Sequence, residues 1–477
     1  MSKKRISSGI KELNDILNGG LIKQKSYLIK GGAGTGKSTL GYLFLKNGNE
    51  NDENTMLITL GESAENVKSN SRQLGIDLEK TRFLDLSPGS QDYGKKINYS
   101  VFSPVEVEAE PIAEQVVKAI NEFKPNRVVI DSLTMLKYIY ENQIQYKNMA
   151  LSLIRYVCSS GATLMMVAET HRSADEDESE FWVDGVIQLT YSKDWRRIRV
   201  NKFRGSGFSE GYHAMKIDKG GVKVYPRLKP SDYGRKFIST PLSSGIAELD
   251  EMLHGGIEKG TVSMLTGPTG VGKTNLGIQF LKEAASRNER SVMYSFEESA
   301  DVIIKRSKLI GVPVDEMIEA GKLEIISIEP FSYSPDEFTM RVRDDIESKG
   351  TKMVLIDSIG GYTLTVREEN ALERIHSLCI YMSNVGVTSF LISETSNITG
   401  EFVTTNLHAS YLADNILFLR YLELDGSLKK SIGILKKRMS DFEKTIRQFS
   451  IQAEGISVGK PLNNLRGILS GLPELIK

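Results

Sequence analysis

Short apolar runs alternate with longer amphipathic stretches along this chain. In its first half, residues 26–29, 56–60, 127–130 and 162–167 are apolar runs with the length of buried strands. Between two of them, residues 112–123 carry apolar side chains three or four positions apart, as on one face of a helix. We therefore predict an α/β fold in which a mostly parallel, twisted sheet is covered by helices on both faces.

The whole pattern occurs twice. The segment ISSGI at residues 6–10 returns as LSSGI at residues 242–246, and a repeat this long indicates duplicated domains rather than a solenoid. Prolines and polar residues around position 230 predict a stiff linker between the copies. We predict one domain over residues 1–230 and a second over residues 231–477. Later landmarks keep the same order: Asp131-Ser132 and Asp357-Ser358, Glu169-Thr170 and Glu394-Thr395, and residues 184–191 and 414–421.

The composition excludes some classes of function. The 477 residues include 61 Lys and Arg against 61 Asp and Glu, and this balance disfavours a dedicated nucleic-acid-binding protein. No apolar run reaches the ~18 residues of a membrane-spanning helix, and no signal peptide is recognisable, so we expect a cytoplasmic protein without membrane contact. Cys158 and Cys379 lie in apolar, helix-like contexts and are expected to be buried thiols rather than metal ligands.

Two glycine-rich segments carry the clearest chemistry. GGAGTGKS at residues 31–38 and GPTGVGKT at residues 267–274 fit the pattern GxxxxGK[ST], and each follows a predicted strand and precedes a predicted helix. Glycines let the backbone turn tightly and direct its N–H groups at the phosphates of ATP, and the next helix adds its positive end. The predicted ATP-binding residues are Gly31, Gly32, Ala33, Gly34, Thr35, Gly36, Lys37, Ser38 and Thr39 in the first copy, and Gly267, Pro268, Thr269, Gly270, Val271, Gly272, Lys273, Thr274 and Asn275 in the second.

A magnesium site is expected beside each phosphate loop. Lys37 and Lys273 are predicted to reach the β- and γ-phosphates, while the hydroxyl after each lysine ligates Mg²⁺. An aspartate ends an apolar strand in each copy, where it faces the ligand crevice of a doubly wound sheet and can hold Mg²⁺ directly or through water. The alternative is an aspartate that only caps a turn. The predicted metal ligands are Ser38, Asp131, Thr274 and Asp357.

Acidic residues follow the second predicted strand of each copy. The second copy has the pair Glu297 and Glu298, whereas the first has Glu62 alone, because Gly61 stands where Glu297 stands. A carboxylate there can orient or deprotonate a nucleophile, and repulsion between adjacent carboxylates favours a base near neutral pH. We predict catalytic roles for Glu62, Glu297 and Glu298, with the first site the slower one. A solvated acidic loop is the alternative.

These motifs resemble the KaiC family, which includes the circadian-clock ATPase and its bacterial and archaeal relatives. The resemblance extends from residue 6 to about residue 473. Besides the phosphate loops, it rests on the two SSGI openings, on KFRGS at residues 202–206, on YLELDG at residues 421–426 and on ILSGLP at residues 468–473. It implies tandem RecA-like P-loop NTPase domains that assemble as a homohexameric double ring, with ATP and Mg²⁺ at the subunit interfaces.

The resemblance also implies cations that act between subunits. In the family, a Lys-x-Arg segment of one subunit reaches the γ-phosphate bound to its neighbour, in the role of an arginine finger. Lys202 and Arg204 would serve the first ring, and Lys436 and Arg438 the second. The sequence alone leaves a basic surface run as the alternative for residues 436–438.

The family's second ring phosphorylates itself on an adjacent serine and threonine. Here Ser410 falls on the serine position, Tyr411 replaces the threonine, and Thr405 precedes Ser410 by five residues. The resemblance therefore implies Ser410 and Thr405 as candidate phosphosites, with Glu297 as the base. Met439 stands where the family has glycine, and the long tail that binds the clock partner KaiA is not expected, so the sequence favours ATP hydrolysis over clock timing by the cyanobacterial mechanism.

Two other functions remain open at this stage. A nucleic-acid motor would need to bind DNA through the basic run at residues 193–199, although the acidic run at residues 173–180 would repel phosphates and the basic run could equally pair across a sheet. A slow signalling scaffold would use the same ATP sites, with a protein partner that reads the nucleotide state.

Overall fold

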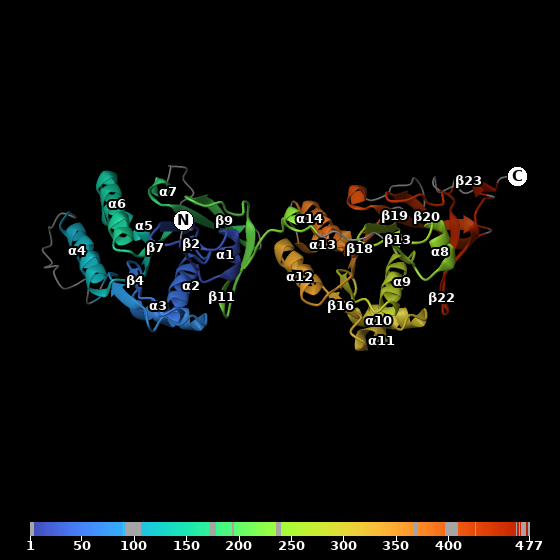
Figure 1. Cartoon of the computed structure of the whole chain (residues 1–477), viewed down its shortest axis with the longest axis horizontal. Helices are drawn as coiled ribbons and strands as arrows, with labels where there is room; N and C mark the ends of the chain where they lie inside the picture. The colour runs from blue at the N-terminus through green and yellow to red at the C-terminus, as the bar shows by residue number, and fades with distance from the viewer. Residues whose placement is uncertain are drawn as a thin grey trace. The chain divides into compact units, whose positions relative to one another are not determined.

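The chain divides into two compact units, Met1–Arg227 and Leu228–Lys477 (Figure 1). The computed structural model describes residues 4–88, 90, 106–140, 142–170, 178–192, 195–234, 240–366, 370–395, 409–424, 426–463, 465, 466, 468, 474 and 475.

The main sheet of the first unit has nine strands in the described residues, in the order β11-β10-β9-β8-β3-β7-β6-β4-β5. Neighbouring strands run parallel from β8 to β5, and β9, β10 and β11 extend the sheet antiparallel at one edge. The strands are β3 (Ser26–Gly31), β4 (Thr55–Thr59), β5 (Arg82–Asp85), β6 (Arg127–Asp131), β7 (Thr163–Glu169), β8 (Gly185–Ser192), β9 (Trp195–Phe203), β10 (His213–Asp218) and β11 (Gly221–Tyr225).

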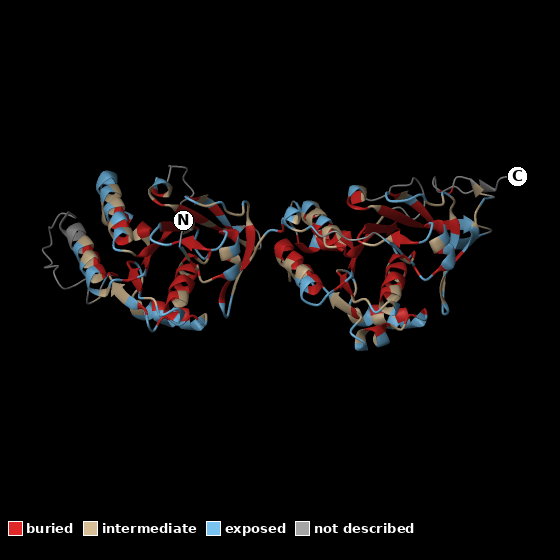
Figure 2. Ribbon diagram, in the orientation of Figure 1, coloured by how far each residue is buried: buried red, intermediate tan, exposed pale blue. Residues whose placement is uncertain are grey.

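Helices cover both faces of this sheet because its central strands are apolar on both sides. Val129 packs with residues of α2 and α3, whereas its neighbours Val128 and Ile130 pack with residues of α4, α5 and α6 on the opposite face. Figure 2 shows the strands as mainly buried and the outer helix faces as exposed. The helices are α1 (Lys11–Ile16), α2 (Lys37–Glu50), α3 (Ala64–Gln73), α4 (Glu106–Phe123), α5 (Leu133–Ile139), α6 (Gln143–Ser159) and α7 (Ser179–Trp182).

The second unit repeats this topology. Its main sheet has the order β16-β15-β17-β18-β14-β19-β20-β21-β22, which matches the first unit strand for strand. The predicted α/β fold with a mostly parallel sheet in each half is therefore confirmed. The strands of this sheet are β14 (Val262–Gly267), β15 (Ser291–Ser295), β16 (Leu323–Ser327), β17 (Met353–Asp357), β18 (Thr388–Glu394), β19 (Asn415–Leu424), β20 (Ser427–Lys437), β21 (Arg447–Gln452) and β22 (Gly455–Pro461).

Most helices of the second unit also correspond to those of the first, and short strand pairs complete both units. The helices are α8 (Ala247–Met252), α9 (Lys273–Ser286), α10 (Ala300–Leu309), α11 (Val314–Glu319), α12 (Pro335–Glu347), α13 (Ile359–Val366) and α14 (Ala371–Asn384), with 3₁₀ turns η1 (Pro230–Asp232) and η2 (Ala409–Leu412). Helix α11 has no counterpart among the described residues between α3 and β5, and the 3₁₀ turn η2 stands in place of α7. The two-stranded sheets pair β1 (Arg5–Ile6) with β2 (Leu21–Ile22), β12 (Pro241–Leu242) with β13 (Ile257–Glu258), and β23 (Leu465–Arg466) with β24 (Glu474–Leu475).

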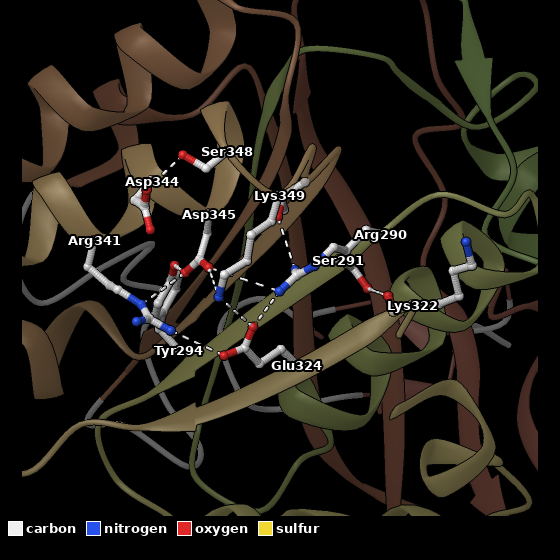
Figure 3. A network of polar contacts seen from close by, with 11 residues as sticks. Arg290, Ser291, Tyr294, Lys322, Glu324, Arg341, Asp344, Asp345, Ser348 and Lys349 are labelled. Atoms are coloured by element: carbon white, nitrogen blue, oxygen red, sulfur yellow. Dashed lines mark hydrogen bonds and ion pairs between the residues drawn. The ribbon is translucent and has the colours of Figure 1, made fainter. Parts of the chain in front are cut away.

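The two units attach one helix differently. In the second, Asp345 of α12 is fully buried and accepts a hydrogen bond from Tyr294 of β15, while Lys349 lies 2.8 Å and Arg341 3.2 Å from its carboxylate oxygens (Figure 3). Burial alone would raise the pKa of Asp345, but the hydrogen bonds from Lys349 and Tyr294 and the charge of Arg341 hold it below its usual value. At the strand position of Tyr294, the first unit has the apolar Ile58.

Candidate functional site

The two glycine-rich loops adopt closely similar backbones. Gly34 and Gly36 have φ values of 69° and 98°, and Gly270 and Gly272 have 76° and 116°, a region in which other residues are strained. A Cβ atom at Gly36 would also lie 2.5 Å from the side chain of Ile217, and Gly272 is crowded in the same way. The conformation of each loop therefore requires glycine at these positions.

Each loop leads directly into a long helix. Helix α2 begins at Lys37 and α9 at Lys273, and the residue before each is a glycine with no side chain to cap the helix. The N–H groups of the first turn have no partner within the helix, and the positive end of the helix dipole lies beside them. Each loop and helix start therefore form an anion site of the kind that binds phosphate.

The lysine at the start of each helix is buried and folded back over its loop. Lys37 Nζ donates to the Gly32 carbonyl at 2.7 Å, and Lys273 Nζ donates to the Gly267 and Pro268 carbonyls at 2.9 Å each. Burial lowers the pKa of both lysines, and nearby carboxylates oppose the effect. A desolvated ammonium in this position gains strongly from an anionic ligand.

A hydroxyl and an aspartate meet behind each loop. Thr274 Oγ1 donates to Asp357 Oδ2 at 2.8 Å, and Ser38 is hydrogen-bonded to Asp131 in the first unit. Burial raises the pKa of Asp131, and burial reinforced by two neighbouring glutamates raises the pKa of Asp357 to about 6. Both aspartates precede a cis peptide bond. A buried carboxylate with a raised pKa gains from a cation, and these oxygens are of the type that Mg²⁺ prefers.

These oxygen pairs fit Mg²⁺ only if the ion takes further ligands. Among the described residues, no three His, Cys, Asp or Glu side chains are arranged to hold a metal ion. Mg²⁺ usually keeps several waters and binds through one or two protein oxygens plus substrate phosphates. The pairs at Ser38 and Asp131 and at Thr274 and Asp357 match that mode of binding.

The predicted catalytic carboxylates lie in different surroundings. Glu297 accepts a hydrogen bond from the buried Ser358, next to Asp357, and its charge acts on Lys273. Glu298 instead pairs with Arg306 of α10 at 2.6 Å. Its counterpart Glu62 accepts a hydrogen bond from Asn70 of α3 at 2.7 Å. Of these three predicted carboxylates, the one beside the phosphate loop is therefore Glu297, and the first unit has Gly61 at that position.

One acidic contact was not predicted from the sequence. Glu394, the last residue of β18, has Oε1 3.5 Å from Lys273 Nζ and accepts a hydrogen bond from Thr269 Oγ1 at 3.1 Å. Glu169 ends β7 at the equivalent place, and its charge raises the pKa of Lys37 against the larger effect of burial. Both glutamates are visible in the sequence as landmarks of the repeat, but only the strand register shows that they lie beside the loops.

Two cations over the loops were also missed. Arg196 Nε of β9 donates to the Gly34 carbonyl at 3.1 Å, and Lys430 Nζ of β20 donates to the Gly270 carbonyl at 3.2 Å. Each cation also lies over the ring of a tyrosine on the preceding strand. The equivalent placement in the two units indicates a conserved arrangement within the repeat. In the sequence, the only available signal was a basic side chain in a polar strand.

The Lys-x-Arg segments lie at the other end of the sheet. Lys202 of β9 pairs with Val186 near the start of β8, whereas the phosphate loop follows the far end of the parallel strand β3. Lys202 Nζ donates to the Glu180 carbonyl at 2.7 Å, with Arg204 two residues further on. The second unit repeats the placement, since Arg438 lies 3.3 Å from Asp414 before β19. Neither segment reaches the phosphate loop of its own unit.

The candidate phosphosite lies at this same end. Ser410 belongs to η2, and its carbonyl accepts a hydrogen bond from Lys436 Nζ at 3.2 Å. Tyr411 is exposed and meets the ring of His376 edge-on. Thr405 lies outside the described residues. Ser410 is therefore separated from the phosphate loop of its own unit by the length of the parallel strands.

The basic run considered for DNA binding is engaged within the sheet. Residues from Trp195 onward form β9, with the guanidinium of Arg199 over the ring of Tyr212 and Lys216 over the ring of Trp195. Residues 171–177, 193 and 194 lie outside the described residues. No helix in the described part of the chain is long and apolar enough to cross a membrane.

A family model described as "ATPase: KaiC" matches residues 6–229 and, a second time, residues 242–463. The chain belongs to the KaiC family. Relatives over nearly the full length include the circadian clock protein KaiC3 of Synechocystis, 28% identical over 98% of this chain and 94% of that protein. The circadian clock oscillator proteins KaiC of Parasynechococcus marenigrum and Synechococcus elongatus are each 27% identical, over 100% and 98% of this chain and 94% and 91% of theirs. The two units are thus KaiC ATPase domains with nucleotide-binding P-loops.

Proposed function

We propose that this protein is a Mg²⁺-dependent ATPase that assembles as a homohexameric double ring, phosphorylates itself in the second ring and signals its nucleotide state to a protein partner. The observation that carries the proposal is the pairing of Thr274 with Asp357 behind an intact phosphate loop, repeated at Ser38 and Asp131. The names of the full-length relatives support a regulatory role.

The two phosphate loops have the same task in this mechanism. The loop N–H groups and Lys37 or Lys273 bind the β- and γ-phosphates, which displace the lysine from the loop carbonyls. Ser38 with Asp131, and Thr274 with Asp357, would hold the metal. When bound, Mg²⁺ neutralises the charge that develops on the phosphate oxygens during transfer. The residues of the loop fix the phosphates in line with the attacking oxygen.

The cations at the far end of each sheet act on a neighbouring subunit. Lys202 lies level with Leu28, three residues before Gly31, and its ammonium donates to a carbonyl of α7 rather than to the phosphate loop. Lys436 is held in the same way by the carbonyls of Ser410 and Ala413. In a ring, one subunit's far end meets the next subunit's loop, where a cation stabilises the transition state. ATP hydrolysis in each ring then depends on assembly.

The second ring uses the same geometry for phosphoryl transfer. The γ-phosphoryl group leaves ADP for the Oγ atom of Ser410 on the neighbouring subunit, and the Ser410 proton passes to the Glu297 carboxylate. Thr405 is the second candidate acceptor. In the first ring, Gly61 supplies no carboxylate beside the phosphate loop and Glu62 accepts a hydrogen bond from Asn70, so turnover there is slower.

Intact mass spectrometry after incubation with Mg-ATP tests this proposal. The wild type is expected to gain about 80 Da, the mass of one phosphoryl group, with peptide mapping to Ser410 or Thr405. Glu297→Gln is expected to lose this gain, whereas Glu62→Gln, the matched control in the first unit, keeps it. Release of phosphate without any gain in mass would restrict the function to ATP hydrolysis and contradict the autokinase proposal.

A further inference from the structure

The ammonium group of Lys202 rests on a very short helix. Its Nζ atom lies 2.7 Å from the carbonyl oxygen of Glu180 and 3.5 Å from that of Phe181, both in α7. Figure 1 shows α7 next to β9, the strand that carries Lys202. Helix α7 has only four residues, too few to be stable alone, so side-chain contacts must fix the direction of its carbonyls.

One of these contacts is an ion pair with the strand before the phosphate loop. The Glu180 carboxylate pairs with the ammonium of Lys30, the residue that directly precedes Gly31. The two side chains are 31% and 12% exposed, so water screens this pair less than a surface pair. Since Glu180 also supplies the carbonyl at 2.7 Å, a single residue connects Lys30 with Lys202.

We propose that Lys30 and Glu180 are positioning residues for the first ring, because their ion pair fixes α7 and thereby holds Lys202 in the direction of the neighbouring subunit's nucleotide. This inference rests on the proposed action of Lys202 between subunits. Burial and the charge of Arg204 lower the pKa of Lys202, so its ammonium depends on well-placed carbonyls.

The second unit lacks this ion pair. Counted from the aspartates that precede β8 and β19, Ser410 corresponds to Glu180, and counted from the phosphate loops, Thr266 corresponds to Lys30. A serine and a threonine cannot form an ion pair. There, Lys436 Nζ is held by the carbonyls of Ser410 at 3.2 Å and Ala413 at 2.7 Å. The proposed positioning of a lysine by an ion pair therefore applies to the first unit.

Steady-state ATP hydrolysis by the full-length chain tests the inference. A Lys273→Ala background removes turnover by the second unit. In this background, Glu180→Gln and Lys30→Met are each expected to lower kcat about tenfold and to leave KM for ATP within about twofold, because Lys202 acts in the transition state. The double variant should lose no more than either single variant, and Lys30→Arg should restore kcat because it keeps the charge.

Two comparisons make the result decisive. Lys147→Met removes an exposed ion pair with Glu178 at the start of α7 and is expected to leave kcat unchanged. Unchanged kcat in Glu180→Gln, or losses that add in the double variant, would overturn the inference. Lys202→Ala in the same background distinguishes a failure of the positioning role from a failure of the proposed action of Lys202. If it abolishes turnover while Glu180→Gln does not, only the positioning role is wrong; if it keeps full turnover, the proposed action of Lys202 is wrong as well.

Discussion

Glu394 and Lys273 lie side by side in the second unit, with Oε1 3.5 Å from Nζ and the lysine almost completely buried. The Glu394 carboxylate pairs with a lysine whose proposed partner is the triphosphate of ATP. An incoming nucleotide must therefore overcome repulsion from the Glu394 carboxylate and replace it as the partner of Lys273. This relationship joins the end of β18 to the phosphate loop and makes Glu394 a competitor of the ligand.

Replacement of Glu394 by Gln is expected to tighten ATP binding at the second site by roughly tenfold at low salt, because it removes the repulsion between two anions. Titration with a fluorescent ATP analogue in a Lys37→Ala background measures this site alone. Glu423→Gln, which changes an exposed carboxylate near the end of β19, should leave the affinity unchanged. Weaker binding by Glu394→Gln would show that the carboxylate supports the ligand instead.

The cations over the loops are expected to contribute to nucleotide affinity. Lys430 lies on the Gly270 carbonyl, within the region where phosphates would bind, and a cation there attracts an anionic ligand. Lys430→Ala should weaken ATP binding at the second site about tenfold in the same titration. Lys429→Ala, which removes an exposed charge on the adjacent position of β20, is the matched control. Equal affinities for the two variants would contradict the assignment.

The missing carboxylate of the first unit can be restored. A Cβ atom at Gly61 would lie 3.4 Å from Met135 Cγ, an ordinary contact, and Gly61 is exposed, so a side chain can be added there. Gly61→Glu is expected to raise turnover of the first unit by about three- to tenfold, since it places a general base where Glu297 stands in the second. Phosphate release in a Lys273→Ala background measures the change. Gly61→Ala should leave the rate unaltered, which separates the carboxylate from the effect of filling space.

Acid should destabilise the second unit through Asp345. Its pKa is held below the usual value near 3.8, so the ionised carboxylate stabilises the folded state above that pH, and the contribution disappears as the pH falls through the lowered value. Asp345→Asn should lower stability at pH 7 by about 1–3 kcal/mol and reduce the further loss below about pH 4. Calorimetry at several pH values measures both. The neighbouring exposed Asp344→Asn should behave like the wild type.

Local patterns predicted the strands and the phosphate loops well, because a glycine-rich turn between strand and helix is encoded by adjacent residues. The run at residues 162–167 becomes β7, Thr163–Glu169, and residues 112–123 form the later part of α4. Contacts across the sheet were harder to predict. Glu394 reaches the loop because β14 pairs Gly267 with it, a register that alternating apolar positions cannot specify for a strand buried on both faces.

The remaining contacts that the sequence did not predict come from the antiparallel hairpins β8–β9 and β19–β20. Arg196 and Lys430 each contact a glycine about 160 positions earlier in the chain, and their approach depends on how two antiparallel strands twist over the loop. The basic character of β9 is visible in the sequence, which favoured pairing within a sheet over DNA binding but could not show which groups the basic side chains contact. The structure engages these side chains with loop carbonyls and aromatic rings.

Glu180 and Ser410 stand at matching positions of the two units but differ in how their charge can change. Glu180 carries a carboxyl group as part of its own side chain. Ser410 has a neutral hydroxyl that, once phosphorylated, would carry a charge of about −1.5 to −2. In the proposed double ring, a phosphorylated second unit would thus come to resemble the first electrostatically. The first unit would then serve as a constant reference, and the second as a variable that the history of ATP turnover can set.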